Sequence, residues 1–333
     1  MIIYNGQASH CTYWRGNRVF NFNPFRLSTL STPFYVENTS EETATISIGV
    51  VPESDFEYWV WDTVPIQKSL DKSSWTNAGT GRNGVYISIE PHKRVYLRAT
   101  ANAWGGKAYQ EGDGGYYWAE GHISIQCNKP HNVGGNIFSL LYGEDFNSQT
   151  EFKNSGDMPF KELFYKDTNL IDAFDLLLPA ETLKSSCYDL MFYGCTNLVS
   201  APELPATTLA DKCYYYMFYG CTNLVSAPSC LPATTLVASC YEDMFSQCIN
   251  MIKSPDILAT TLASRCCILM FDGCSNLNHI KVMFTTTPAV SYTAYWVRGV
   301  AASGTFIKNP AATWNVTGTE GVPSGWTIEY ASN

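Results

Sequence analysis

Apolar positions in the C-terminal half of the chain recur at a fixed interval. Met191, Met217, Met244 and Met270 are separated by 26, 27 and 26 residues, and each lies four residues after a cysteine and directly before a phenylalanine. A period in the twenties predicts a solenoid, in which each coil buries its apolar residues only by stacking on its neighbours. Such an architecture favours binding over catalysis.

Each copy of the repeat also predicts the course of its coil. A Thr-Thr-Leu type segment offers a hydroxyl N-cap, and the Cys-Tyr-x-x-Met-Phe stretch after it predicts a short helix. Gly194, Gly220 and Gly273 are expected to end that helix in the left-handed conformation. Gln247 replaces glycine in the third copy, so its helix should end differently. The extended segment that follows predicts a short strand, with pairing that ends at a proline such as Pro202.

The chain has 12 cysteines, and most of them belong to the repeat. A small apolar side chain that recurs once per coil is typical of an interior position, so buried free thiols are favoured over disulfides or zinc. Cys230 is the extra residue of the 27-residue interval and is expected to bulge at a corner. The cysteines predicted to form the repeat core are Cys187, Cys195, Cys213, Cys221, Cys240, Cys248, Cys266 and Cys274.

The other parts of the chain complete an α+β fold. Residues 1–31 form an irregular aromatic segment expected to serve attachment, and short β-branched or aromatic runs in 32–150 predict an antiparallel β-sandwich. Repeats with a short helix and a short strand per coil occupy 151–284, and 285–333 reads as a C-terminal β cap whose tryptophans cover the last coil. The strands expected in the sandwich are 34–36, 43–50, 56–61, 85–89, 95–98 and 122–126.

The charge composition of the chain limits the kinds of partner that it is expected to bind. The net charge is -9 and only 15% of residues are charged, which disfavours nucleic acid and anionic membrane surfaces as partners. The sequence has no apolar run long enough to cross a membrane. The first residues lack the features of a signal peptide, so synthesis and folding in a cytoplasm are expected if Met1 is the true start.

Catalytic and metal-binding patterns in the sequence are weak. The five histidines are scattered, and Cys127 near His122 and His131 is the one cysteine outside the repeat that suggests Cys–His chemistry. These three residues are interpreted as strand residues with a thiol in the core. Acidic pairs such as Glu111 and Asp113 are interpreted as solvated loop charges. The sequence therefore predicts no catalytic residue, no metal site and no cofactor.

Three groups of residues are candidates for a binding surface. Trp59 and Trp61 share one face of an expected strand and suit stacking on a sugar ring or anchoring of a partner, although burial of both faces is an equal alternative. Tyr215 and Tyr216 are expected to point outward from the repeat. The third group is the polar position two after the repeat leucine, which varies from coil to coil: Asp172, Ser200, Ser226, Lys253 and His279.

The Phe-x-x-Cys-x-x-Leu core of the repeat closely resembles the BspA-type (bacterial surface antigen) leucine-rich repeat found in proteins of gut Bacteroides and their phages. Residues 160–284 carry the resemblance, and the Gly-Trp ending near Trp326 resembles the usual C-terminal cap. The region before the repeats, ending in Gly134 to Phe146, also resembles the domain that often precedes them. The resemblance implies adhesion or protein recognition.

The function expected from the sequence is a non-enzymatic structural or adhesion protein. The leading hypothesis is a phage virion fibre or decoration protein, assembled in the host cytoplasm, that docks on other virion proteins by its N-terminal part. Its repeats would bind a host glycan or surface protein, and the protein could form a homo-oligomer. A bacterial cell-surface adhesin is the alternative, and a carbohydrate-active enzyme with an accessory repeat module is a third possibility.

Overall fold

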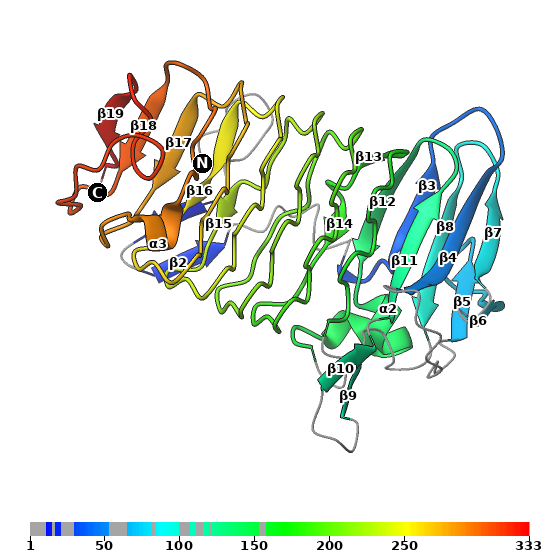
Figure 1. Ribbon diagram of the computed structural model, residues 1–333. Coiled ribbons are helices and arrows are strands. Elements are labelled where there is room, and N and C mark those ends of the chain that lie inside the picture. The colour runs from blue at the N-terminus through cyan, green and yellow to red at the C-terminus, as the bar shows by residue number, and fades with distance from the viewer. Residues whose placement is uncertain are drawn as a thin grey trace.

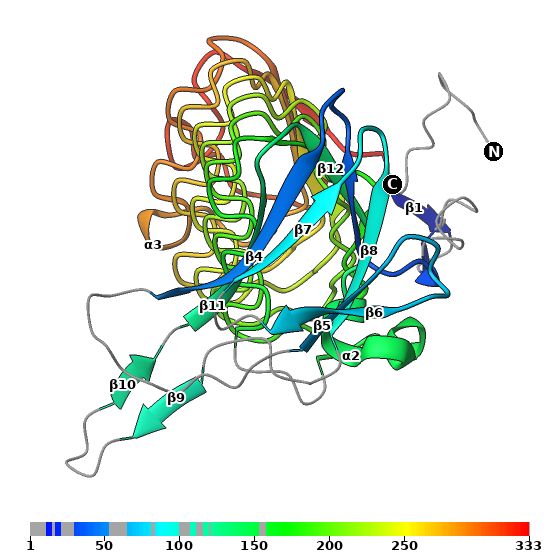
Figure 2. The same cartoon turned by 90° about the vertical axis from the view of Figure 1, so that its right-hand side faces the viewer.

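The computed structural model describes residues 11–14, 17–20, 30–52, 65–80, 84–99, 107–110, 116–119, 121–152 and 158–332. The C-terminal part is a β-solenoid, and antiparallel sheets lie at the N-terminal end of this solenoid (Figure 1). Figure 2 looks along the solenoid and shows its coils stacked in register. The predictions of a solenoid and of antiparallel sheets before it are therefore confirmed.

Two sheets form the N-terminal part. The first has the order β11-β4-β7 and is antiparallel. The second has the order β13-β12-β3-β8-β5-β6 and receives its first strand from the solenoid. The expected strand over 56–61 lies outside the described residues. The strands of this part are β3 (Tyr35–Asn38), β4 (Ala44–Pro52), β5 (Pro65–Ser69), β6 (Thr76–Thr80), β7 (Val85–Ile89), β8 (Arg94–Ala99), β11 (Gly121–Cys127) and β12 (His131–Asn136). Two short hairpins pair β1 (Cys11–Trp14) with β2 (Asn17–Phe20), and β9 (Lys107–Gln110) with β10 (Tyr116–Ala119).

Alternation along the strands places one face of each sheet in a shared core. In β7, Val85, Ile87 and Ile89 are buried, whereas Tyr86 and Ser88 face outward. The same period of two recurs in β8 and β4, as expected for strands with one buried face. The outer face of β11-β4-β7 therefore carries polar residues that are at least partly exposed: Thr45, Ser47, Tyr86, Ser88 and Gln126.

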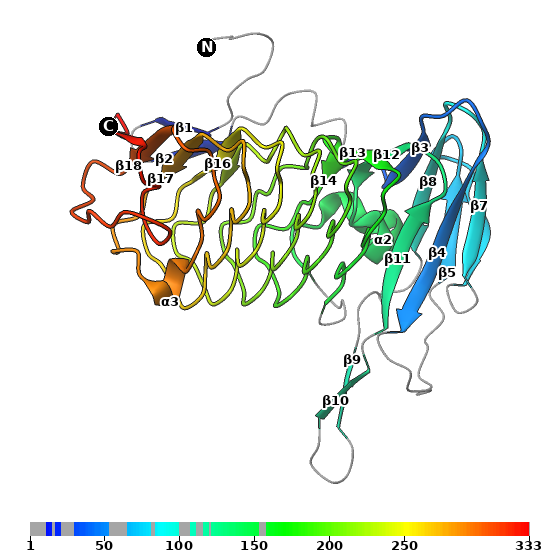
Figure 3. The ribbon, with the colours of Figure 1, turned by 45° about the horizontal axis from the view of Figure 1, so that its top comes forward.

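Strand β12 connects the two-sheet part with the solenoid. It pairs antiparallel with β3 and, on its other edge, parallel with β13 (Leu170–Asp172) and β14 (Leu176–Leu177). The last strand expected from the sequence in this part was 122–126, so β12 was not predicted. Figure 3 shows β12 beside the first coil, with α2 (Ser139–Tyr142) and the 3₁₀ helix Gly143–Ser148 following it.

Parallel strands run along one side of the solenoid. Its five-stranded sheet has the order β15-β16-β17-β18-β19, and isolated parallel bridges such as Asp172–Ser200 link the earlier coils. Pro255 lies within β16, where the pairing with β17 becomes irregular between Lys253 and Asp256. The proline thus interrupts the register, and the strand continues beyond it. The strands are β15 (Cys230–Leu231), β16 (Lys253–Ile257), β17 (His279–Val282), β18 (Thr305–Lys308) and β19 (Thr327–Tyr330).

The predicted helix of each coil is wrong. From Cys187 to Gly194 the chain is a succession of turns, and the equivalent segments of the other coils are the same. The backbone N–H groups of this segment alternate between acceptors in the next coil and acceptors in their own coil. Those of Tyr188 and Phe192 donate to the next coil, whereas that of Met191 donates to the carbonyl three residues before it.

Ring stacking explains why a helix does not form. Phe164, Phe192, Phe218, Phe245 and Phe271 stack from coil to coil with centroid separations of 5.2, 5.3, 5.4 and 5.8 Å. An α-helix with its side chains is about 10 Å wide, so helices on successive coils would hold these rings too far apart. Flat turns allow backbone hydrogen bonds and ring contacts between the same two coils.

Left-handed residues recur in each coil. Gly194, Gly220 and Gly273 have φ of 68°, 70° and 73°, as the sequence predicted. Gln247 occupies the same position with φ 64°, so the expectation of a different ending in the third copy is wrong. Non-glycine residues such as Leu190 (φ 56°) also adopt this conformation. The stacked coils supply the packing that offsets this backbone cost.

The eight repeat cysteines are free and fully buried. In four coils the thiol donates to a phenylalanine carbonyl of the preceding coil, as in Cys195 Sγ to Phe164 O at 2.9 Å and Cys221 Sγ to Phe192 O at 3.1 Å. Cys230 does not follow this pattern, because it lies in β15 and is disulfide-bonded. The expectation that it bulges at a corner is wrong.

The C-terminal residues close the solenoid with a further coil and a final strand. Trp296 occupies the position of the repeat methionine and packs against Phe271, Phe284 and Phe306. The short helix α3 (Val290–Thr293) precedes it. The indoles of Trp314 and Trp326 are buried, and they donate to carbonyls of Phe284 and Ala301. Strand β19 ends the sheet with an exposed set of side chains.

Candidate functional site

A line of polar residues runs across successive coils on the strand side. Asp172 pairs with Ser200 and Ser200 with Ser226, while Lys253 pairs with His279 in the next strands. The structure therefore brings the five positions chosen from the sequence onto one line, which we call the polar line. All five are exposed or half-buried.

An apolar column lies beside the polar line. Val199, Val225 and Ile252 directly precede its members, and 39%, 50% and 53% of their surfaces are exposed. Backbone hydrogen bonds between neighbouring coils fix the column, including Val225 N to Val199 O at 3.0 Å. These residues were not predicted from the sequence, although an apolar residue recurs directly after Leu198, Leu224 and Met251. We call the polar line and this column together the strand ridge.

Charges concentrate at the C-terminal half of the strand ridge. Asp256 lies between two lysines, 2.7 Å from Lys281 Nζ and 3.6 Å from Lys253 Nζ. Partial burial, and then the neighbouring Lys253, lower the pKa of His279. The imidazole is therefore mainly neutral at pH 7 and offers both a donor and an acceptor.

Tyrosines gather on the turn side of the solenoid. Tyr193 stacks on Tyr165 at 5.1 Å and on Tyr219 at 4.9 Å between ring centroids. Tyr216 tilts against Tyr219 at 5.3 Å and contacts Tyr215 at 4.4 Å. Tyr215 and Tyr216 are half-buried, so they face outward only in part. Because several ring faces are used within the cluster, it is better suited to stiffening the coils than to stacking on a sugar.

A buried carboxylate lies beneath these tyrosines. Asp243 interacts with the Tyr216 hydroxyl, while its Oδ2 has no hydrogen-bond partner. Burial raises the pKa of Asp243 to about 6, and the nearby Glu242 and Asp272 act in the same direction. This group therefore carries a cost of burial when it is ionised near neutral pH.

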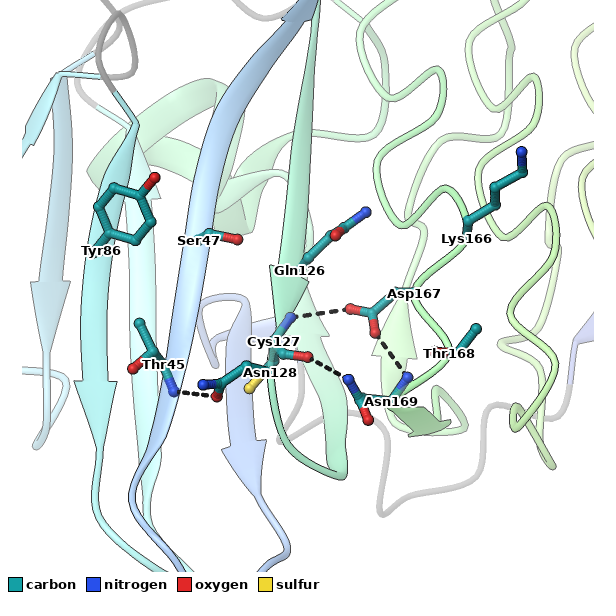
Figure 4. A pocket seen from close by; sticks show the side chains of 10 residues that line it. All are labelled: Thr45, Ser47, Tyr86, Gln126, Cys127, Asn128, Lys166, Asp167, Thr168 and Asn169. Atoms are coloured by element: carbon teal, nitrogen blue, oxygen red, sulfur yellow. Dashed lines mark hydrogen bonds between the residues drawn. The ribbon is translucent and has the colours of Figure 1, made fainter.

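A cleft of about 330 Å³ lies where the outer face of β11-β4-β7 meets the first coil (Figure 4). Asp167 forms its floor and occupies the position that is cysteine in later coils. Its carboxylate accepts the backbone N–H groups of Cys127 at 3.1 Å and Asn169 at 3.0 Å. His131 Nε2 is 3.4 Å away. This arrangement holds the first coil against β11.

The cleft does not form a Cys–His catalytic pair. Burial raises the pKa of Cys127, which is the opposite of what a nucleophilic thiolate requires. Burial also lowers the pKa of His131 and raises that of Asp167. The imidazole is enclosed, with 1% of its side chain exposed. The side chain of His122 and the tryptophans Trp59 and Trp61 lie outside the described residues.

Within the described ranges, no cluster of three or more His, Cys, Asp or Glu residues is placed to hold a metal ion. None of the described helices combines the length and apolar character needed to span a membrane. Comparison of the chain with protein-family models, curated proteins and solved structures yields no match.

Proposed function

We propose that the protein is a non-enzymatic binding protein whose strand ridge recognises a molecule on a cell surface. The observation that carries this proposal is the contrast between the two sides of the same repeat. Inward positions keep cysteine, phenylalanine and leucine from coil to coil, whereas the polar line holds Asp, Ser, Ser, Lys and His. The backbone is therefore alike from coil to coil, whereas the side chains that it presents outward differ.

The composition of the strand ridge suits a protein or glycoprotein partner. An exposed apolar strip bordered by polar and charged groups is characteristic of interaction surfaces. Val225 and Ile252 provide apolar surface that binding would remove from water, while Lys253 and His279 can form directional hydrogen bonds with a partner. A rigid frame lowers the entropic cost of binding because few side chains have to be ordered.

The setting follows from the sequence resemblance to BspA-type leucine-rich repeats. We place the protein on a phage virion, with the N-terminal part directed to other virion proteins and the strand ridge directed to a gut Bacteroides host. A bacterial adhesin would use the same ridge on a different carrier. The proposal for the ridge is independent of which carrier is correct.

Binding of the labelled protein to intact cells of a panel of gut Bacteroides strains tests the proposal. The double variant Val225→Lys, Ile252→Lys should bind at least tenfold more weakly than the native protein, because contacts at the centre of an interface contribute about 2 kcal/mol or more. The matched control is Thr208→Lys, Thr235→Lys, which adds the same charge at exposed positions on another stretch of the coils. It should bind like the native protein.

Two results would count against this function. One is native protein that binds to no strain of the panel. The other is equal cell binding by the ridge variant and the threonine control. Thermal unfolding of both variants should give native-like midpoints, which separates loss of recognition from loss of folding.

A further inference from the structure

One wall of the cleft is a row of side chains on three adjacent strands. Ser47 on β4 lies opposite Gln126 on β11 and opposite Tyr86 on β7. Directly paired residues project from the same face of a sheet, and strands are about 4.8 Å apart, so this row spans about 10 Å. It forms a short polar track that leads towards the first coil (Figure 4).

The opposite wall is held in place by hydrogen bonds to β11. Asn169 Nδ2 donates to Cys127 O at 3.0 Å, and Gln126 Nε2 donates to Tyr165 O at 3.0 Å. Asp167 adds the bond from Cys127 N–H. A ligand would therefore meet two walls whose separation is already fixed, which lowers the cost of ordering them.

Neutral polar groups remain available in the cleft. Within the part of the chain that the structure describes, the side-chain hydroxyls of Thr45, Ser47 and Tyr86 make no hydrogen bond. Asn128 accepts the Thr45 N–H through Oδ1 at 2.7 Å, which leaves its amide N–H groups to donate. Gln126 uses its amide nitrogen, which leaves Oε1 to accept.

Charge contributes little to this cleft. The Asp167 side chain is 2% exposed, and its carboxylate already accepts backbone N–H groups. The Lys166 ammonium lies 4.9 Å from the centroid of the Tyr165 ring and is the one cation among the lining residues. A site for phosphate or carboxylate would present several cations or clustered N–H groups. The lining instead fits an uncharged ligand with many hydroxyls.

We propose that this cleft binds a neutral saccharide of one or two rings. Tyr86 is 71% exposed and provides an aromatic surface for the apolar side of a sugar ring. The hydroxyls and amides along the row provide donors and acceptors for the sugar hydroxyls. A volume of about 330 Å³ lies at the lower end of the range of roughly 300–1,000 Å³ typical of small-ligand sites, which limits the ligand to a short saccharide.

This site is separate from the strand ridge and does not depend on the function proposed for it. A glycan array of neutral and acidic mono- and disaccharides identifies ligands, and calorimetric titration with the best neutral saccharide measures its affinity. Tyr86→Ala and Gln126→Ala should each weaken that affinity about tenfold or more. The control Tyr330→Ala removes another exposed tyrosine (59% exposed) and should leave it unchanged.

The results distinguish the proposal from its alternatives. Neutral saccharides should bind with a Kd that is unchanged between 50 and 500 mM salt, because no charge pair has to be screened. The proposal is overturned if no neutral saccharide binds, if acidic saccharides bind preferentially, or if binding persists in Tyr86→Ala and Gln126→Ala. The ridge variant Val225→Lys, Ile252→Lys should retain saccharide binding, so failure of one proposal leaves the other measurable.

Discussion

At the scale of single residues, the repeat cysteines combine small volume with a weak donor. Cys221 is fully buried, and its thiol donates to Phe192 O, which also accepts the backbone N–H of Cys195 at 3.1 Å. Each carbonyl therefore has partners from its own coil and from the next. Regular spacing in the sequence was sufficient to predict burial of these thiols. Their acceptor could not be predicted, because it depends on how far successive coils are offset.

The buried carboxylate of Asp243 provides a prediction about pH. Its pKa of about 6 is above the ordinary value of about 3.9, so the folded protein binds this proton more tightly than the unfolded chain. Its contribution to the free energy of unfolding is therefore lost as pH rises from about 4 to about 6. Asp243→Asn should raise the thermal midpoint relative to the native protein at pH 7.5, with a smaller gain at pH 5.

Asp211→Asn is the matched control, because it makes the same substitution at an exposed aspartate of the solenoid. It should show no comparable difference between the two pH values. An equal gain for Asp243→Asn at pH 5 and pH 7.5 would mean that burial of the ionised carboxylate is not what limits stability here.

At the scale of elements, the sequence predicted where each coil turns but not the kind of turn. The Cys-Tyr-x-x-Met-Phe segment has apolar residues three and four apart, which is the spacing of a helix face. In the solenoid these residues point inward because left-handed residues recur every four positions, as at Ser186, Leu190 and Gly194. Only one of these three positions is usually glycine, so the sequence carried a weak signal for them.

The glycine position provides a prediction at this scale. Gly220 has φ 70°, and a Cβ there would meet only Gly194 Cα at 3.9 Å, so conformation rather than space is the constraint. Gly220→Ala should lower the free energy of unfolding by about 1 kcal/mol, as measured by urea denaturation. Gly49→Ala is the control, because Gly49 has no positive φ and a Cβ there meets nothing within 4 Å. A cost at Gly49 equal to that at Gly220 would contradict this explanation.

At the scale of the whole molecule, the core is continuous from the two sheets into the solenoid. Phe34 of the sheet part packs on Phe164 of the first coil at 6.1 Å, and Ile125 N–H donates to Leu163 O at 2.7 Å. Asp167 stands where later coils have a cysteine, and its neighbour on that side is β11, whose Cys127 N–H its carboxylate accepts.

The strand ridge was predictable only in part. The polar line followed from counting along the repeat, since equal spacing in a solenoid gives equal position. The exposure of Val225 and Ile252 could not be predicted. If each coil consisted of a helix and a strand, as the sequence suggested, an apolar residue at this position would be expected in the core. The cleft could not be predicted, because it depends on the register of three strands and on their contact with the first coil. No local sequence pattern specifies either.

Site-specific photo-crosslinking tests the central claim most directly. A photoreactive amino acid replaces Val225 on the strand ridge in one protein. In a second protein it replaces Thr235, one of the two exposed control positions away from the ridge. Each protein is irradiated on intact Bacteroides cells. The account predicts one dominant crosslinked cell-surface partner from position 225 and little or none from position 235. A partner captured from position 235 alone, or captured equally from both positions, would contradict the assignment of recognition to the strand ridge.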